Sequence, residues 1–283
     1  MKIIYRSPGS ITLFFYPSGI KDNPLSYGSV GIGLVVNRFV FSEVEDSTDT
    51  EIKINDREYR DTVQERILGM IQRKARIDVR TEIDISQGFG TSAAGSLSTA
   101  FALNDLFNLN MTYYELSGMA HRAEIEKRSG LGDVASIITG GFTVRIKPGI
   151  PPYGFIDSLN VYDKEFVYMI SERPIETREI LMNEEKRKLI LKYGRESMKM
   201  FLNDKSVENA FDLALHFSRK IGIMDPELNE VIEKTRDYGR VTQIMIGNSL
   251  IAFGENDRIE KIFEKYGRSG KLKLIKCGIS RVY

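Results

Sequence analysis

Alternating apolar and polar positions mark the first third of the chain and predict strands rich in β-branched and aromatic residues. These strands are predicted at residues 2–6, 10–16, 34–44 and 50–54. The period then changes, because residues 59–73 place their apolar side chains at helical spacing, whereas residues 80–86 alternate again. The first part of the chain is therefore expected to form an antiparallel sheet that one helix interrupts.

Three consecutive helices are predicted after this sheet. Residues 92–107 are apolar on nearly every side, which favours a buried helix over an amphipathic one. Thr112 and Glu115 form a capping box that begins the second helix, and Gly130 is its expected stop. The third helix is short, begins at Asp133 and leads into a double-glycine turn. Helix is therefore expected to follow helix directly.

A strand is predicted after the double glycine, and its residues separate into two faces. Phe142, Val144 and Ile146 share one face, whereas Thr143 and Arg145 share the other. Arg145 is therefore expected to point away from the apolar face of this strand.

Residues 147–164 hold three of the eight prolines and predict the crossing between two domains, at residues 1–150 and 160–283. Beyond the crossing, the pattern predicts an α+β layer of ferredoxin-like character. Asp225 is an expected helix cap, with Pro226 at the first helical position. The other elements are strands at 165–171, 241–246, 249–253 and 271–276 and helices at 174–202, 206–221 and 256–266.

The composition excludes several classes of function. Lys and Arg number 40 against 39 Asp and Glu, and no basic stretch with interleaved aromatic residues occurs, so nucleic acid is not an expected partner. The single Cys277 excludes an internal disulfide and a cysteine-rich metal site, and is expected to be a small buried residue. No run approaches the ~20 apolar residues of a membrane span and no signal peptide is evident, so the expected compartment is the cytoplasm.

The stretch “QGFGTSAAG”, Gln87 to Gly95, lies between a predicted strand and the buried helix. A glycine-rich turn that begins a helix exposes backbone N–H groups to an anion, which makes phosphate the expected ligand; close helix packing without a ligand is the alternative. A dinucleotide-binding fold needs a second parallel strand after the helix, and here a second helix stands there. A P-loop needs a Gly-Lys pair before its Ser or Thr, and this stretch contains no lysine.

Within this stretch, “GFGTSAAG” resembles the P-x-x-x-G-L-G-S-S-A motif of the GHMP kinases, the superfamily of galactokinase, homoserine kinase and mevalonate kinase. Three other stretches resemble that family in its order: “SPGSITLFFYP” (7–17), “HRAEIEKRSGLGDVASIITGG” (121–141) and “MIGNSLIAFG” (245–254). Together with “YGSVGIG” (27–33), which is expected to be a second glycine-rich loop, they are most similar to the archaeal pantoate kinase branch.

This resemblance implies an α+β, two-domain GHMP kinase fold, with an N-terminal ribosomal-protein-S5-like domain and a C-terminal ferredoxin-like domain. It implies ATP as the phosphoryl donor and Mg²⁺ as the metal. Ser92 and Glu124 are the implied magnesium ligands, since a hard cation takes hydroxyl, carboxylate and phosphate oxygens. The triphosphate is expected on the backbone of Gly88, Phe89, Gly90, Thr91, Ser92 and Ala93.

For the acceptor, the resemblance implies pantoate, phosphorylated on its primary hydroxyl to 4-phosphopantoate in coenzyme A synthesis. Asp133 matches the family's aspartate and is expected to engage that hydroxyl. Ser29, His121 and Arg145 are the expected substrate contacts, with Arg145 offering a planar fork to the carboxylate. Structural roles are the alternatives: a helix cap for Asp133 or Ser92, an exposed charge for Glu124, and a satisfied buried residue for His121.

Two positions depart from the wider superfamily. Many members have lysine where this chain has Ser10, and the C-terminal glycine motif keeps Gly247 but is followed by Asn248 and Ser249. Both departures disfavour a mechanism like that of mevalonate kinase. A homoserine or mevalonate kinase, and a non-catalytic regulator that binds ligand without turnover, remain as alternatives, and a homodimer is left open.

Overall fold

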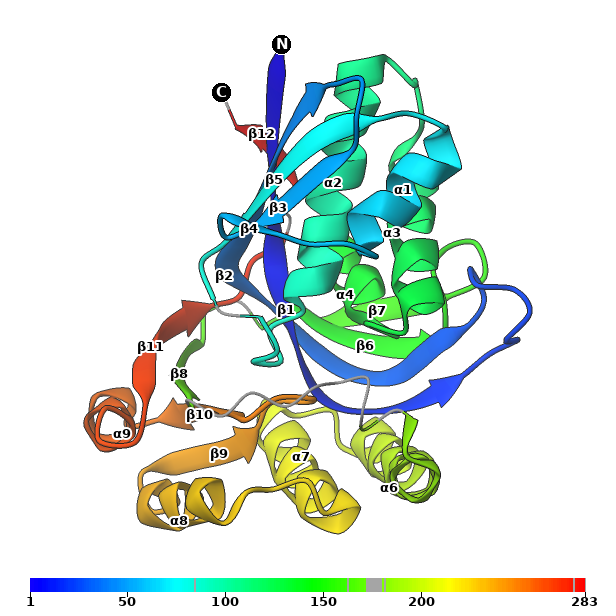
Figure 1. Ribbon diagram of the computed structural model, residues 1–283. Helices are drawn as coiled ribbons and strands as arrows, with labels where there is room; N and C mark the ends of the chain where they lie inside the picture. The colour runs from blue at the N-terminus through cyan, green and yellow to red at the C-terminus, as the bar shows by residue number, and fades with distance from the viewer. Residues whose placement is uncertain (84, 162, 172–179, 181, 277, 283) are drawn as a thin grey trace.

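The computed structural model describes residues 1–83, 85–161, 163–171, 180, 182–276 and 278–282. Cys277 and the beginning of the helix predicted at 174–202 lie outside the described residues. The described elements form two sheets with their helices (Figure 1). The mixture of sheets and helices confirms the α+β prediction.

The first sheet has eight strands among the described residues and is built around two long ones, β1 (Lys2–Ser18) and β2 (Gly28–Asp46). These pair antiparallel along most of their lengths, with register shifts at Pro8/Gly9 and Thr12/Phe14. The two strands predicted within residues 2–16 are therefore one irregular strand. The path runs β12-β1-β2-β5-β3-β4, with β6 beside β2 and β7 beside β6. The shorter strands are β3 (Glu51–Ile54), β4 (Arg57–Glu58), β5 (Ala75–Thr81), β6 (Phe142–Lys147), β7 (Phe155–Leu159) and β12 (Ser280–Val282).

Four helices pack beside this sheet (Figure 1), namely α1 (Val63–Ile71), α2 (Thr91–Phe107), α3 (Tyr113–Lys127) and α4 (Asp133–Thr139). The capping box of Thr112 and Glu115 is present at the start of α3. The helix ends before Gly130, because Arg128 adopts the left-handed conformation with φ 56° and closes the last turn. The prediction of Gly130 as the stop was therefore wrong by two residues.

The second sheet runs β11-β8-β10-β9, and each neighbouring pair is antiparallel. Asp225 caps α8 with Pro226 in the first turn, as expected. In Figure 1, α6, α7 and α8 lie at the bottom, away from α1 to α4, and α9 lies beside β11. The strands are β8 (Glu165–Ile170), β9 (Gly239–Gln243), β10 (Ser249–Gly254) and β11 (Arg268–Lys273), and the helices are α6 (Glu184–Asn203), α7 (Val207–Ile221), α8 (Pro226–Thr235) and α9 (Asn256–Phe263).

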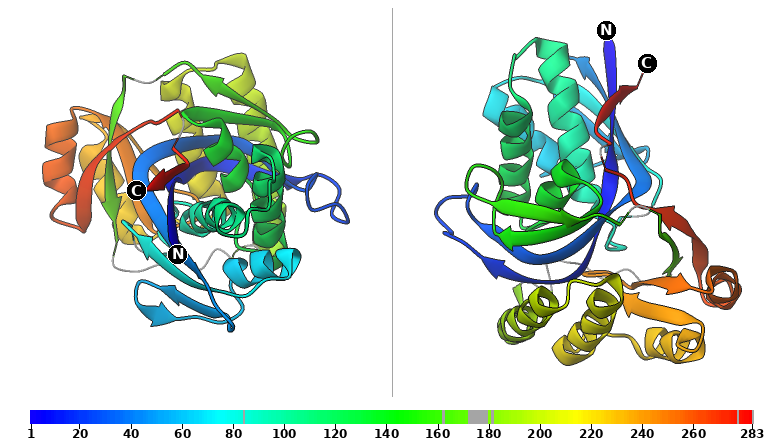
Figure 2. Two further views of the ribbon diagram at one scale, coloured as in Figure 1. Left: turned by 90° about the horizontal axis from the view of Figure 1, so that it is seen from above. Right: turned by 180° about the vertical axis from the view of Figure 1, so that it is seen from behind.

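One hydrophobic core joins the two halves of the molecule. Phe14 of β1 packs against Phe201 of α6 and Phe217 of α7, with ring centroids 6.3 and 6.5 Å apart. The end of the chain also returns to the first sheet, where β12 pairs with β1, so that the two termini lie side by side (Figures 1 and 2). The domain boundaries and the homodimer remain predictions.

Three predicted elements differ from the structure. The expected loop at residues 27–33 belongs to β2 except for Tyr27, which precedes the strand. Its glycines let other backbone approach, since a Cβ on Gly31 would lie 2.2 Å from the carbonyl oxygen of Phe14. The strand predicted at 80–86 is β5, which begins and ends earlier, since Ala75, Ile77 and Val79 are the buried alternating set. The proline-rich crossing contains β7, which pairs with β6.

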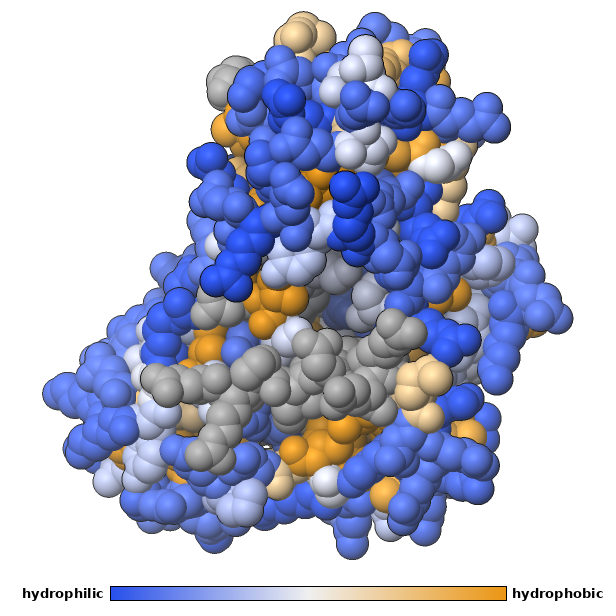
Figure 3. All heavy atoms as spheres, in the orientation of Figure 1, coloured by the Kyte–Doolittle hydropathy of each residue, from blue (hydrophilic) through white to orange (hydrophobic). Residues whose placement is uncertain are grey.

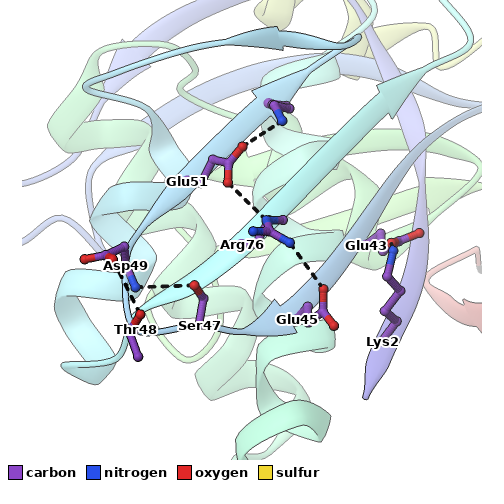
Figure 4. A network of polar contacts seen from close by, with 9 residues as sticks. Lys2, Glu43, Glu45, Ser47, Thr48, Asp49, Glu51 and Arg76 are labelled. Atoms are coloured by element: carbon purple, nitrogen blue, oxygen red, sulfur yellow. Dashed lines mark hydrogen bonds and ion pairs between the residues drawn. The ribbon is translucent and has the colours of Figure 1, made fainter.

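Polar side chains bridge the strands at the end of the first sheet remote from the second (Figure 4). Arg76 of β5 contacts Glu45 of β2 and Glu51 of β3, and Lys2 pairs with Glu43 across β1 and β2. Hydrophilic residues cover much of the face seen in Figure 3. Among the described residues, no helix is long and apolar enough to cross a membrane.

Candidate active site

A cleft of about 300 Å³ opens between the glycine-rich turn, the end of α3 and a segment that precedes β10. It collects residues that are far apart in the sequence, including Thr12 of β1, Ser29 of β2 and Met245. Most of the site predicted from the sequence lines it: Ser29, Gly88, Phe89, Gly90, Thr91, Ser92 and Asp133.

The glycine-rich turn is held in a conformation that suits only glycine at two positions. Gly88 and Gly90 have φ of 83° and 59°, and a Cβ at Gly90 would lie 2.9 Å from the carbonyl oxygen of Ser10. Helix α2 begins at Thr91, and its N-cap Gly90 offers no side chain to the first N–H groups. Phe89 anchors the turn, because its buried ring meets Tyr168 of β8 edge-on at 5.5 Å. The amides at the start of α2 therefore lack a side-chain cap and suit an anion.

The C-terminal glycine motif supports this turn from behind. A Cβ on Gly247 would lie 2.5 Å from the carbonyl carbon of Gln87 and 2.7 Å from the amide nitrogen of Gly88. The carbonyl oxygen of Gly247 also accepts a hydrogen bond from Gln243 Nε2 at 3.0 Å. Gly247 is therefore required for the contact between the second sheet and the turn, despite the changed residues that follow it.

Ser92 lines the cleft, and its Oγ donates a 2.6 Å hydrogen bond to Oε1 of Glu124, which is not itself a lining residue. Glu124 is 2% exposed, and its Oε2 has no hydrogen-bond partner. Burial, together with the nearby negative charge of Asp133, raises the pKa of Glu124 to about 7, although the hydrogen bond from Ser92 opposes the shift. A buried carboxylate oxygen without a partner, beside a hydroxyl, suits a hard divalent cation. Among the described residues, no cluster of three metal-binding side chains exists.

Asp133 lines the cleft and lies near Glu124. A point beside Gly130, where a Cβ would stand, is 2.6 Å from Glu124 Oε2 and 3.6 Å from Asp133 Oδ2, so both carboxylates face it. Thr12 Oγ1 donates to Asp133 Oδ1 at 3.4 Å. Burial raises the pKa of Asp133, and the positive charge of Arg145 partly offsets this effect. Asp133 is not the N-cap of α4, since Gly132 holds that position.

Arg145 lies behind Asp133 rather than on the surface of the cleft. Its side chain is 1% exposed, and it donates to Ser136 Oγ at 2.6 Å and to Thr12 Oγ1 at 3.4 Å. Burial lowers the pKa of Arg145 to about 10, although the charge of Asp133 opposes the shift. Both faces of β6 are covered at this position. The polar side chain of Arg145 therefore belongs to a buried hydrogen-bond network and not to an exposed face.

One nitrogen of Arg145 remains without a hydrogen-bond partner. This atom is Nε, and a Cβ on Gly132 would lie 2.7 Å from it and 2.3 Å from Ser29 Oγ. Both distances are shorter than a van der Waals contact, so only glycine lets Ser29 Oγ and Arg145 Nε lie this close to the backbone of residue 132. A hydroxyl and an unsatisfied guanidinium N–H are groups that can bind a carboxylate.

His121 does not line the cleft. It is 1% exposed on α3, and its Nε2 lies 2.8 Å from the carbonyl oxygen of Tyr27, just before β2 begins. Burial lowers the pKa of His121, although hydrogen bonds to the carbonyls of Tyr27 and Pro24 oppose the shift. The neutral ring therefore anchors the segment that leads to Ser29.

Sequence reasoning missed three polar contributors to the site. Thr12 and Ser136 hold Arg145 and Asp133 in place, and Arg128 lines the cleft beside Ser129. Their signal in the sequence is weak, since hydroxyl residues and arginine are common on any strand or helix end.

Comparison with known proteins identifies the family. The GHMP kinases N terminal domain matches residues 59–141. The chain is 30% identical over 277 residues to the pantoate kinase of Methanospirillum hungatei. The aligned residues cover 94% of this chain and 92% of that protein. It belongs to the GHMP kinases. The pantoate kinase of Thermococcus kodakarensis is also 30% identical, over 272 residues that cover 90% of this chain and 88% of that protein. This GHMP kinase is therefore an ATP-dependent small-molecule kinase.

Solved structures agree with this assignment. A phosphotransferase related to the coenzyme A biosynthesis pathway superposes with a TM-score of 0.86 at 25% identity, covering 100% of this chain and 99% of that one. The mevalonate diphosphate decarboxylase of Enterococcus faecalis matches with a TM-score of 0.75 at 11% identity, covering 100% of this chain and 99% of that one. The second likeness shows the shared fold alone.

Proposed function

We propose that this GHMP kinase transfers the γ-phosphoryl group of ATP to the primary hydroxyl of pantoate, giving 4-phosphopantoate for coenzyme A synthesis. The names of its relatives support pantoate as the acceptor. The observation that carries the proposal is the convergence of Ser29 Oγ and the unpartnered Arg145 Nε beside Gly132. A hydroxy acid bound there by its carboxylate would extend its hydroxyl toward the neighbouring Asp133. The proposal places the reaction in the cytoplasm, where ATP is available.

The donor side uses the turn and the Ser92–Glu124 pair. Backbone amides of residues 88–93 would hold the triphosphate, because the N-terminus of α2 favours negative charge. Ser92 Oγ and the free oxygen of Glu124 would hold Mg²⁺. When bound, the cation neutralises charge on the phosphates.

Asp133 acts on the acceptor. As the acceptor oxygen bonds to the γ-phosphorus and the bond to the departing ADP breaks, the hydroxyl proton passes to the Asp133 carboxylate. Its raised pKa makes it a better proton acceptor than an exposed aspartate. Thr12 and Arg145 fix its orientation.

Ser29, His121 and Arg145 together define the acceptor site in this proposal. Ser29 and Arg145 would contact the carboxylate directly, the latter through Nε. His121 would act through Tyr27, whose carbonyl it holds at 2.8 Å, and so set the position of Ser29. Two buried groups for one carboxylate match a small hydroxy acid better than a large acceptor.

The test is an acceptor screen by mass spectrometry with ATP and Mg²⁺, using pantoate, homoserine and mevalonate, with Asp133→Asn as the matched inactive variant. Phosphorylation of pantoate in preference to the other acceptors is the expected result. Preference for homoserine or mevalonate would replace the acceptor assignment. Binding of ATP without phosphorylation of any acceptor would favour a ligand-binding regulator.

A further inference from the structure

Three charged residues line the cleft among the described residues, namely Lys127, Arg128 and Asp133. Lys127 is engaged, because its ammonium pairs with Asp61 and its side chain is only 16% exposed. Arg128 is different. In the part of the chain that the structure describes, no carboxylate pairs with its guanidinium. Among the described residues, Arg128 is therefore a cation of the cleft without a carboxylate partner.

The backbone of Arg128 is firmly held while its side chain is exposed. Its N–H donates to the carbonyls of Glu124 and Ile125 at the end of α3, and the left-handed φ of 56° turns the chain into the cleft. Its Nη1 lies 3.0 Å from Met182 Sδ. A thioether sulfur is a weak acceptor, so the hydrogen-bonding capacity of the guanidinium remains available to an anion.

The glycine-rich turn cannot supply this charge itself. Residues 87–95 contain no lysine or arginine, so its contribution is limited to backbone amides and the helix dipole. Arg128 follows Glu124 by one helical turn and precedes Asp133 by five residues. It therefore stands on the segment that joins the proposed metal ligand to the proposed base, and it lines the cleft there.

We propose that Arg128 binds the γ-phosphate of the nucleotide and stabilises the charge on its oxygens during transfer. This inference rests on the proposed function for the position of the triphosphate. The acceptor carboxylate is the less suitable ligand, because Ser29 and Arg145 already converge on a separate point beside Gly132. A planar guanidinium matches two phosphoryl oxygens, and in other phosphoryl-transfer enzymes an arginine in this role changes turnover by about 10³ to 10⁵.

The experiment compares nucleotides that differ only in the γ-phosphate. Calorimetric titrations with ADP and with the non-hydrolysable β,γ-methylene analogue of ATP, both with Mg²⁺, are performed on wild type, Arg128→Met and Arg128→Lys. The left-handed backbone conformation is similarly unfavourable for methionine, lysine and arginine. The comparison therefore isolates the effect of the side chain. Arg122→Met is the matched control, because Arg122 is an exposed residue of the same helix that pairs with Glu126.

Arg128→Met is expected to weaken the triphosphate analogue by about 10- to 150-fold, as for loss of a charge-assisted contact, and to leave ADP nearly unchanged. Arg128→Lys should weaken binding of the triphosphate analogue by a smaller factor. Arg122→Met should leave the affinity for both nucleotides unchanged. Turnover of Arg128→Met should fall by more than its nucleotide affinity.

Three outcomes would overturn the assignment: equal weakening of both nucleotides, an effect on acceptor KM alone, or no effect at all. The titrations need no acceptor. If wild type binds the triphosphate but does not phosphorylate pantoate, the proposed function fails while the role of Arg128 is still decided.

Discussion

Ser249 Oγ donates a 3.1 Å hydrogen bond to Gln87 Oε1, and both side chains are buried. Ser249 is the first residue of β10, and Gln87 immediately precedes the glycine-rich turn. This hydrogen bond and the contact of Gly247 with Gln87 join the second sheet to the backbone that is proposed to hold the triphosphate. The shape of the phosphate site therefore depends on residues far from it in sequence.

Ser249→Ala tests this dependence. It leaves the amide oxygen of Gln87 buried without its partner, so stability should fall by about 1 to 3 kcal/mol. ATP affinity should fall by up to about tenfold, equivalent to about 1.4 kcal/mol, because the turn loses its support. Urea unfolding and ATP titration measure the two effects.

Ser218→Ala is the matched control, since this buried serine of α7 donates to the carbonyl of Leu215, and neither residue lines the cleft. It should lower stability without changing ATP affinity. If Ser249→Ala behaves like the control, the second sheet does not shape the phosphate site.

Asp133→Asn tests the proposed base. The substitution keeps the size of the side chain and removes its charge, so turnover should fall by about 10² or more. Stability should fall as well, because the buried Arg145 loses the nearby negative charge. Asp133 does not cap α4, hence loss of a cap does not complicate the result. Steady-state kinetics and thermal unfolding measure the two quantities. Turnover close to that of wild type would leave Asp133 with a structural role only.

The carboxylate site is tested at Arg145 and Gly132. Arg145→Lys keeps the charge but loses the planar fork of the guanidinium, whereas Arg145→Met loses both. Pantoate affinity should therefore fall by about 10- to 150-fold in Arg145→Met, and by less in Arg145→Lys. A methyl group on Gly132 would stand 2.3 Å from Ser29 Oγ and 2.7 Å from Arg145 Nε, which is too close, so Gly132→Ala should displace both groups and raise the pantoate KM without removing either.

Pantoate and ATP are titrated separately on each of these variants. ATP affinity should barely change, because the triphosphate is assigned to residues 88–93. Equal weakening of both ligands would indicate a general collapse of the cleft. Weakening of ATP alone would make Arg145 a nucleotide residue.

Local signals explain why the helix ends could be predicted. The capping box of Thr112 and Glu115, and Asp225 followed by Pro226, act within a few residues of chain, so sequence alone reveals them. The segment 27–33 could not be predicted in this way. Its glycines suggested a loop, but they serve the close approach of β1 to β2, which becomes apparent only when the two strands are paired.

In the site too, some features could be predicted from sequence motifs and others depend on the folded structure. The order of motifs was enough to predict that Ser92 and Glu124 would meet, and they do, at 2.6 Å. The burial of Arg145 could not be read from the strand pattern, because its polar face is covered by Thr12 and Ser136 from other elements. The isolation of Arg128 likewise depends on which carboxylates lie near it after folding.

The last prediction concerns the pH dependence of the metal-free protein. Burial raises the pKa of Glu124 to about 7 from its ordinary value of 4.5. Between these values the folded protein keeps a proton that the unfolded chain has lost, so stability must fall as pH rises through this window and stay lower above it. The free energy of unfolding lost across this window is roughly 3 kcal/mol.

Glu124→Gln should remove this contribution, since glutamine does not titrate. Urea unfolding of wild type and variant without metal, at pH values from 4.5 to 8, should therefore show a steeper loss of stability in the wild type. Adding Mg²⁺ should restore wild-type stability above pH 7 more than below it, because the cation favours the ionised carboxylate. Identical pH profiles for the two proteins would show that Glu124 is ionised at its ordinary pKa, and that its free oxygen is not desolvated as the structure indicates.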